Sequence, residues 1–243
     1  MSTVEDLETA ALAESFTSTD SFAAGRLEPL YRPGEPLAVS RFTPAEVPDV
    51  VKLHVECFPG YLLTGLGESF LRRYYGAVAR HPATLGAIAR GVESRRVVAF
   101  ALGTSDAAGV FRSFYRRNLP AIVSIAAVKS ITCPVVRRRV IGIARNAPGA
   151  LRLLAGAKPP APTVPNQPVA RMLSLAAAPP YRGSGAAVLV LRAFEAQVKA
   201  AGFDSVGASC KLWNDRLARF LMSNKWRESA RNDAGRWFER ELV

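Results

Sequence analysis

The chain has 243 residues, and 49% of them are apolar, which is enough to bury the core of one domain with an embellishment or of two small domains. Its three cysteines are odd in number and far apart, and there are only two histidines, so neither a disulfide framework nor a zinc spacing can be built. We therefore expect no metal and a reducing compartment, the cytoplasm. The formal charge of +12 predicts attraction to phosphates, anionic polymers or an acidic membrane surface.

This charge is unevenly distributed along the chain. Residues 1–36 hold seven acids and two bases, a net charge of −5, which leaves +17 on the remainder. The segment is rich in Ser, Thr and Ala and ends in Pro33-Gly34-Glu35-Pro36, so we predict a flexible acidic N-terminal tail over 1–36 and a folded domain over 37–243. Its acidic start is unlike a cationic secretion signal. No stretch reaches the roughly 20 clean apolar residues that a membrane helix needs.

The first part of the folded domain is expected to form a strand, two helices and a hairpin. Thr43-Pro44-Ala45-Glu46 combines a capping box with proline at the first helical position, and this pattern predicts the start of the first helix. The other predicted segments are a strand over 37–42, a loop over 57–67, a second helix over 68–80, and strands over 84–89 and 96–103. The side chains expected inside are Val47, Val50, Val51 and Val55 on the first helix, and Phe70, Leu71, Tyr74, Tyr75 and Val78 on the second.

After Asp106 the pattern changes to a basic helical segment. No Asp or Glu occurs between Ala107 and Phe194, whereas residues 107–171 contain eleven Lys or Arg. Several helices are expected here, broken by Pro120, Pro134 and Pro148, and the five prolines of residues 158–168 predict a connecting loop. We interpret residues 107–168 as a helical insertion.

The last part of the chain alternates strands and helices around a glycine turn. The predicted order is a strand over 170–177, a helix over 186–201, a strand over 204–210, a short helix over 215–224, and a terminal hairpin over 226–229 and 236–242. Gly183 and Gly185 lie in the turn that opens into the first of these helices. Glycines let a backbone approach a ligand closely, and the free N–H groups of a helix's first turn favour an anion.

The glycine turn therefore predicts a pyrophosphate site, with an ordinary tight strand-to-helix turn as the alternative. There is no Gly-Lys-Ser/Thr, so the turn is not a P-loop. Nor is there a Gly-x-Gly-x-x-Gly followed by an acid about 20 residues on, so a dinucleotide-binding fold is unsupported.

The pattern Pro179-x-Tyr181-Arg182-Gly183-x-Gly185-x-Ala187 resembles the Arg/Gln-x-x-Gly-x-Gly/Ala signature of the GNAT acyltransferases. The resemblance covers residues 170–226 and, more loosely, 37–103, but neither the tail nor the insertion. The segment around Phe58-Pro59, Leu66-Gly67 and Phe70-Leu71 is also similar to GNAT relatives associated with bacterial surface polysaccharide synthesis.

The resemblance implies an α/β GNAT fold, with a mixed, mainly antiparallel sheet flanked by helices and the basic insertion between strands three and four. It implies acetyl-CoA as co-substrate, with the pyrophosphate on backbone N–H groups of the glycine turn and the pantetheine arm on the edge of the preceding strand. The cofactor-binding residues carried over are Leu175, Ala176, Ala177, Arg182, Gly183, Ser184, Gly185, Ala186, Ala187 and Asn214.

One position departs from the family pattern. Relatives often carry a tyrosine seven residues after the asparagine as proton donor to the leaving thiolate, but here Leu221 occupies that place, with Phe220 beside it. The glycine-aromatic pair that usually ends this helix is Lys225-Trp226. Another group, or solvent, must then protonate the thiolate, or the chemistry has been lost.

Candidates for the other catalytic roles come from the first helices. His54, Glu56 and Asn214 are the residues we assign to the catalytic site, with Glu68 and Asp106 as further candidate bases. A solvated surface carboxylate is the plain alternative for each acid. Ser209 and Cys210 fall at a strand end near the expected thioester, but no histidine partner supports a nucleophile there.

The basic insertion has three readings: a surface on an anionic membrane, a lid over a phosphorylated acceptor, or a solvated arginine-rich cap. No recognisable reading motif accompanies the charge, which argues against nucleic acid. We predict transfer of an acetyl group from acetyl-CoA to an amine of a small molecule, such as an amino sugar or a phosphorylated or lipid-linked acceptor. The rival is a degenerate CoA-binding or membrane-associated module without turnover. The acceptor and the oligomeric state stay open.

Overall fold

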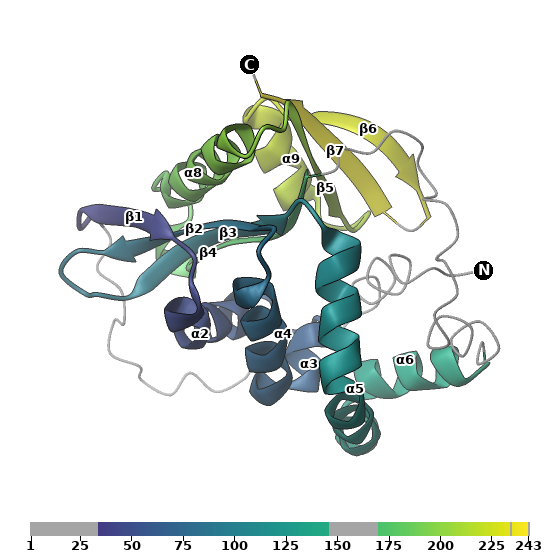
Figure 1. The fold of residues 1–243 in the computed structure, drawn as a ribbon. Helices are drawn as coiled ribbons and strands as arrows, with labels where there is room; N and C mark the ends of the chain where they lie inside the picture. Colours follow the sequence, from purple (N-terminus) through teal and green to yellow (C-terminus); the bar gives the residue numbers. More distant parts are fainter. Residues whose placement is uncertain (1–33, 146–169, 234, 243) are drawn as a thin grey trace.

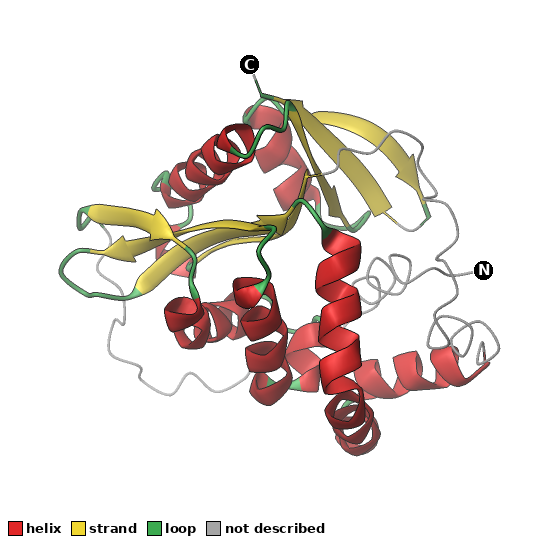
Figure 2. Ribbon diagram, in the orientation of Figure 1, coloured by secondary structure: helices red, strands yellow, loops and turns green. Residues whose placement is uncertain are grey.

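The computed structural model describes residues 34–145, 170–233 and 235–242. Residues 1–33 of the tail predicted over 1–36 lie outside the described residues, as do residues 146–168 of the predicted insertion, including the predicted break at Pro148. The end of the predicted tail, residues 34–36, is described, and there Glu35 is buried. What is described forms an α/β structure with helices on both faces of one sheet (Figure 1, Figure 2). The predicted fold class, a mixed sheet flanked by helices, is thereby confirmed.

The sheet has seven strands in the order β1-β2-β3-β4-β5-β7-β6, and every neighbouring pair is antiparallel except β4 and β5. All seven strands follow predicted segments. β4 coincides with its prediction, and the ends of the other six are shifted by at most a few residues. The strands are β1 (Leu37–Arg41), β2 (Thr84–Gly91), β3 (Val97–Thr104), β4 (Ala170–Ala177), β5 (Ser205–Cys210), β6 (Arg227–Asn232) and β7 (Gly235–Glu241).

The helices cover the two faces of the sheet. Figure 1 shows α8 on one face and α2 and α4 on the other, with α5 and α6 further out. The described helices are α2 (Val47–Cys57), α3 (Leu62–Leu66), α4 (Glu68–Arg80), α5 (Ala107–Thr132), α6 (Pro134–Arg145), α8 (Ala186–Ala200) and α9 (Asp215–Ser223), with 3-10 turns at Pro44–Glu46 and Pro179–Tyr181. The predicted capping box is present. The Thr43 side chain accepts from the Ala45 N–H, and the Glu46 carboxylate accepts from the Thr43 N–H.

The core is built from the predicted apolar faces. On α4 all five predicted side chains are buried, whereas on α2 Val55 is only partly buried and His54 is buried instead. The described helices α5 and α6 stand between β3 and β4, where the insertion was expected, and its extent stays a prediction.

Two local predictions were wrong. Pro120 does not break the helical segment, since α5 runs through it from Ala107 to Thr132. Proline removes one backbone N–H, and here the ring is exposed, so the helix loses one hydrogen bond without a clash in the core. The loop expected over 57–67 contains the short helix α3, which is too brief for a helical period to show in the sequence. Pro134 does separate α5 from α6, as predicted.

A β-bulge in β4 shapes the centre of the sheet. Leu102 pairs with Ser174 and Gly103 with Met172, so Leu173 has no partner on β3. A bulge adds local twist and bends its strand, and this one lies where β4 and β5 stop pairing. Gly103 permits the close approach, because a Cβ there would collide with the backbone carbonyl oxygen of Arg171.

We expect Gly103→Ala to lower the free energy of unfolding by about 1–3 kcal/mol, because the backbone at the bulge must move to admit the methyl group. Gly76→Ala is the matched control: its Cβ would meet only the end of the Arg80 side chain and no backbone atom, and alanine favours the helix. Urea denaturation of both variants measures the difference. Equal stability of the two variants would contradict the role given to Gly103.

Candidate functional site

The site begins where two parallel strands diverge. β4 pairs with β5 only over Ala170–Met172, opposite Val206–Ala208, and then continues to Ala177 with no strand partner on that side among the described residues. Figure 1 shows β5, β6 and β7 turned away from the plane of β1 to β4. The backbone N–H and C=O groups of residues 173–177 that face β5 are thus left to pair with a ligand, and Leu175, Ala176 and Ala177 belong to this edge.

The glycine turn follows directly at the end of this edge. Gly183 has φ +85° and Gly185 φ +88°, a region that other residues rarely adopt, and an added Cβ at either position would have no neighbour within 4 Å. Residues 182–185 are exposed. Within the described part of the chain, the backbone N–H groups of Ala187 and Val188 have no acceptor, because the first turn of α8 offers none and no side chain caps it.

The turn is therefore an open backbone cradle with a positive helix end beneath it. The side chain of Arg182, at its start, is exposed, and its charge lies near Cys57 together with that of Arg216 on α9. Free N–H groups, the helix dipole and two guanidinium groups all favour a phosphate-bearing ligand. An added side chain at either glycine would extend into open space beside the turn.

Glu35 fixes the start of this turn, a role that the sequence did not indicate. Tyr181 is buried, and its hydroxyl donates to the Glu35 carboxylate at 2.6 Å. The same carboxylate accepts from Ser94 and Glu93 in the β2–β3 turn. Burial alone would raise the pKa of Glu35, but these hydrogen bonds from Ser94, Tyr181 and Glu93 outweigh it and lower the pKa to about 2. An ionised Glu35 thus ties the glycine turn to the hairpin.

The C-terminal end of α2 lies beside the unpaired edge of β4. The Cys57 thiol donates to the Ala177 carbonyl oxygen at 3.3 Å. One turn earlier, Nδ1 of His54 lies 2.8 Å from the Tyr75 hydroxyl, which in turn lies 3.4 Å from the Ser174 hydroxyl on β4. His54, Tyr75 and Ser174 therefore form one chain of polar groups, buried at His54 and Tyr75 and partly buried at Ser174, that reaches β4 beside the bulge.

Burial controls the protonation of this chain. His54 is only 4% exposed, and burial lowers its pKa to about 4, so its imidazole is neutral at pH 7. Its Nε2 atom is buried and has no hydrogen-bond partner among the described residues. Burial raises the pKa of Tyr75 well above its usual value, so the hydroxyl keeps its proton. A neutral imidazole with an unpaired nitrogen is a proton acceptor.

Tyr61 joins the two sides of the opening, and sequence reasoning missed it. Its hydroxyl oxygen accepts from Nδ2 of Asn214 at 3.4 Å, and its ring contacts Phe58 at 5.2 Å and Trp213 at 5.4 Å between centroids. Burial, the nearby Cys210 and a smaller opposing effect of Asn214 give Tyr61 a pKa of about 12. Because Asn214 donates to the phenol oxygen, the phenol proton remains available.

The amide of Asn214 is used at both ends. Its Oδ1 atom accepts from the Leu217 N–H at 3.1 Å and caps α9, while its Nδ2 atom contacts Tyr61. Leu221 is fully buried, so position 221 faces the core and holds no polar group. Trp226 is also buried, and its Nε1 donates to Glu195.

The remaining candidates are spread over the fold. Glu56 is exposed on the last turn of α2, close to Cys57. Glu68 begins α4 and pairs with Arg72 at 3.6 Å. Asp106 caps α5 at the end of β3 that lies beside Arg171, the opposite end from Ala177.

At the end of β5, Ser209 is exposed, and burial raises the pKa of the Cys210 thiol to about 11, which keeps it protonated. In the described residues, no group of three or more His, Cys, Asp or Glu is arranged to hold a metal ion. The described helices include none that is both long and apolar enough to cross a membrane.

Solved structures with a similar fold were found by structural alignment. SsHAT aligns with a TM-score of 0.58 at 16% identity, over 85% of this chain and 98% of its own. PaiA N-acetyltransferase from Thermoplasma acidophilum, in complex with coenzyme A, aligns at 0.50 with 9% identity over 85% and 99%. Aminoglycoside 6'-N-acetyltransferase AAC(6')-Ih from Acinetobacter baumannii aligns at 0.50 with 11% identity over 81% and 95%.

The chain therefore has the fold of the GNAT N-acetyltransferases, as the glycine signature predicted. No protein-family model matches the sequence, and neither does any curated protein. The similarity to relatives of surface polysaccharide synthesis stays a prediction.

The depressed pKa of His54 predicts how stability depends on pH. Between pH 6.5 and 4 the unfolded chain takes up a proton at this position while the folded chain does not, so the folded state is progressively disfavoured as the pH falls. The difference between the two pKa values corresponds to a loss of about 3 kcal/mol in the free energy of unfolding. This loss is absent above pH 6.5 and reaches its full size near pH 4. We expect His54→Gln, which does not titrate, to lose this part of the pH dependence.

Urea denaturation at pH 7, 5.5 and 4.5 tests this for the wild type and His54→Gln. The difference in unfolding free energy between the two proteins should shift in favour of the variant at each lower pH. A difference that stays constant with pH would contradict a neutral buried imidazole at position 54.

Proposed function

We propose that this protein is an N-acyltransferase that moves an acetyl group from acetyl-CoA to an amine. The single observation that supports this most strongly is the parting of β4 from β5 after Met172 and Ala208, with the glycine cradle at the end of the free β4 edge. An extended, amide-bearing arm fits the edge, and a pyrophosphate fits the cradle. The GNAT fold and a neighbour solved with coenzyme A agree with this assignment.

The residues present fit coenzyme A. The unpaired edge of residues 173–177 offers backbone groups for the two amides of pantetheine, and the N–H groups of Gly183, Gly185, Ala186 and Ala187 surround the position for the pyrophosphate. Arg182 and Ser184 flank it. Bound there, acetyl-CoA supplies an activated acetyl group, and the chain's own residues orient it and handle the protons.

The transfer itself needs proximity and two proton movements. The amine nitrogen forms a bond to the thioester carbonyl carbon, the carbon–sulfur bond breaks, and the amine gives up one proton while the thiolate gains one. We assign the acceptor of the amine's proton to Nε2 of His54 through a relaying water, because this nitrogen is itself buried, with the exposed Glu56 as the alternative at the same end of α2. The chain from His54 to Ser174 holds the imidazole in place.

Tyr61 is our candidate for the proton donor to the thiolate. The position that carries this tyrosine in many relatives is Leu221 here, and it is buried in the core. Tyr61 approaches the same asparagine from the opposite side of the opening, and its pKa of about 12 keeps it protonated. In this chain the phenol is therefore supplied by the loop after α2 and not by α9, and Asn214 contacts it.

A CoA-binding module without turnover is the second candidate, and the burial of Leu221 is the observation that favours it. In that case CoA binds at the cradle but no acceptor causes thiol release.

The acceptor that we propose is a small amine, with an amino sugar or a phosphorylated or lipid-linked amine as the classes to test first, because of the basic surface of α5 and α6. Peripheral contact with an anionic membrane through these helices belongs to the same proposal.

Replacement of Gly185 by tryptophan tests the cradle. We expect Gly185→Trp to weaken acetyl-CoA binding about tenfold or more, a loss of at least about 1.4 kcal/mol, because the side chain fills the pyrophosphate position. Gly202→Trp is the matched control, since Gly202 has φ +86° in open space at the other end of the same helix. Titration calorimetry measures both. Wild-type protein that does not bind acetyl-CoA, or equal loss in both variants, would refute the cradle.

Tyr61→Phe tests the proton donor. With an acceptor identified by thiol release from a panel of amines and amino sugars, we expect kcat to fall about 100-fold or more, in the usual range for lost acid catalysis. Acetyl-CoA affinity should stay close to that of the wild type, which separates chemistry from folding. Leu221→Tyr in the same background should restore nothing, because position 221 is buried. Unchanged kcat in Tyr61→Phe would remove Tyr61 from the mechanism.

A further inference from the structure

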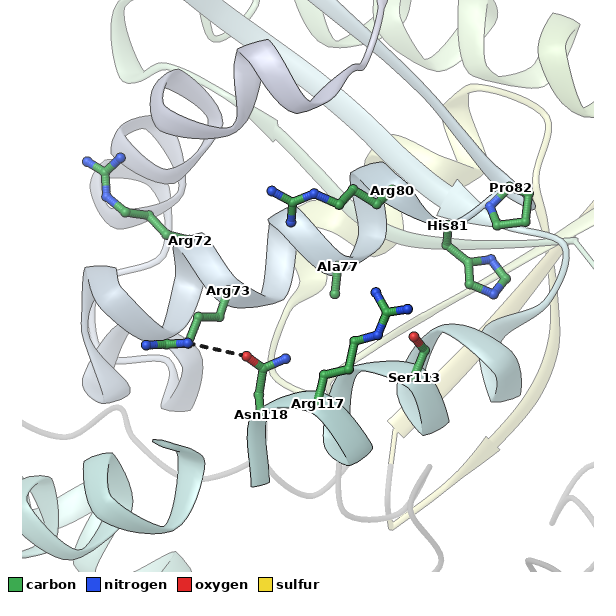
Figure 3. A pocket seen from close by; sticks show the side chains of 9 residues that line it. All are labelled: Arg72, Arg73, Ala77, Arg80, His81, Pro82, Ser113, Arg117 and Asn118. Carbon is green, nitrogen blue, oxygen red and sulfur yellow. Dashed lines mark hydrogen bonds between the residues drawn. The ribbon is translucent and has the colours of Figure 1, made fainter. Parts of the chain in front are cut away.

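A second concave site lies on the outer side of the molecule, between α4 and α5. It is a cleft of about 450 Å³, a volume within the roughly 300–1,000 Å³ typical of small-ligand sites. Figure 3 shows that Arg73, Arg80 and His81 come from α4 and its C-terminal end, with Arg73 beside Asn118 and Arg80 directed back along α4, and that Arg117 extends from α5 toward His81. Arg72, Ala77, Pro82, Ser113 and Asn118 complete its lining.

The cleft gathers positive charge with little to balance it. A smaller hollow beside it, along α5, shares Ser113 and Arg117 and adds Arg112 and Arg116. Among the described residues, Arg73, Arg80 and Arg117 form no ion pair with a carboxylate. The carboxylates near the rim are Glu68, paired with Arg72, and Asp106, which caps α5 and lies 3.8 Å from Nε2 of His81.

Several of these donors are held in place by the fold. Nη1 of Arg73 donates to Oδ1 of Asn118 at 3.5 Å, and Nδ2 of Asn118 donates to the Phe114 carbonyl oxygen, so that the amide links the two helices (Figure 3). Nη1 of Arg80 donates to the Gly76 carbonyl oxygen at 3.1 Å. Guanidinium groups on two facing helices present planar forks of N–H donors, which match phosphate oxygens in geometry and charge.

The cleft is distinct from the glycine cradle. β3 runs from Ala99, opposite Ala177, to Thr104, opposite Arg171, and the cleft borders the Thr104 end of the sheet through Pro82 and the start of α5. The cradle follows Ala177 at the other end. Six residues of β4 separate the two ends, which corresponds to about 20 Å along the strand. A phosphate group in the cleft is therefore a different group from the pyrophosphate at the cradle.

We propose that the cleft between α4 and α5 binds the phosphate group of a phosphorylated ligand, with Arg73, Arg80 and Arg117 as its ligands and Ser113 and Asn118 as neutral donors. The phosphate relieves the mutual repulsion of the arginines and receives bidentate hydrogen bonds from them. Two sources carry this chemistry, a free phosphorylated compound and the headgroup of an anionic lipid. The proposal does not depend on the acyltransferase assignment, because neither the cradle nor the catalytic residues take part.

Titration calorimetry of the full chain with inorganic pyrophosphate, at constant ionic strength, tests the proposal. The test variant is Arg80→Gln with Arg117→Gln. The matched control is Arg41→Gln with Arg231→Gln, which removes the same charge from exposed positions on β1 and β6 outside the cleft. Gly185→Trp separates binding at the cleft from binding at the cradle. Thermal unfolding of each variant verifies that it folds.

We expect the wild type and the control variant to bind pyrophosphate alike, and Gly185→Trp to lose binding at the cradle while it keeps binding at the cleft. Arg80→Gln/Arg117→Gln should bind pyrophosphate at the cleft about tenfold or more weakly, a change of about 1.4 kcal/mol. In a second arm, flotation with vesicles of phosphatidylglycerol or of phosphatidylcholine asks whether a lipid headgroup is the source. Binding to phosphatidylglycerol vesicles but not to phosphatidylcholine vesicles supports the same site with a lipid as its ligand, provided that the Arg80→Gln/Arg117→Gln variant loses this binding.

Three results would overturn the proposal. The first is equal weakening in the control variant, which would reduce the effect to overall charge. The second is pyrophosphate binding that disappears only in Gly185→Trp, which would assign it to the cradle. The third is the absence of both pyrophosphate and vesicle binding by the wild type.

Discussion

Beyond Met172 and Ala208 the backbones of β4 and β5 no longer exchange hydrogen bonds, and the bulge at Leu173 marks the point where they part. Unpaired backbone groups inside a protein are costly, so an open strand edge in the middle of a sheet persists where a ligand can satisfy it. The parting also decides what surrounds the opening. The end of α2, the glycine turn and Asn214 face it only because the two halves of the sheet turn away from each other.

The glycine turn depends in turn on a contact that crosses most of the chain. Glu35 and Tyr181 are 146 positions apart, yet their 2.6 Å hydrogen bond sets the direction in which the turn enters α8. The hydrogen bonds from Ser94 and Glu93 keep the carboxylate ionised, which makes it a strong acceptor for the tyrosine. The cradle is thus supported on one side by a charged anchor and remains open on the other, as a site that admits a phosphate must be.

The two phosphate sites that we propose attract their ligands by different means. At the cradle, the attraction comes mainly from backbone N–H groups and the dipole of α8, so it is directional and short-ranged. Between α4 and α5 it comes from arginine side chains with few neighbouring acids, a field that extends over a Debye length of about 8 Å at physiological ionic strength. The first arrangement suits one diphosphate in one orientation, and the second suits a ligand drawn in by its charge.

By itself the sequence determined the parts whose signals are local: the strand–turn–helix of residues 170–200, the capping box at Thr43, most strand bounds to within a few residues, and the glycine turn at Gly183 and Gly185. Spacing and glycine positions act within a few residues, so a short window contains them. Prediction from the sequence placed a helix break at Pro120 and missed α3, because a few neighbouring residues do not show how a segment packs or how exposed it is. Only the tertiary structure decided that Tyr61 meets Asn214 across 153 positions, that Glu35 anchors Tyr181, and that arginines of α4 and α5 share a cleft. Such pairs depend on how distant elements pack, and no local pattern encodes that.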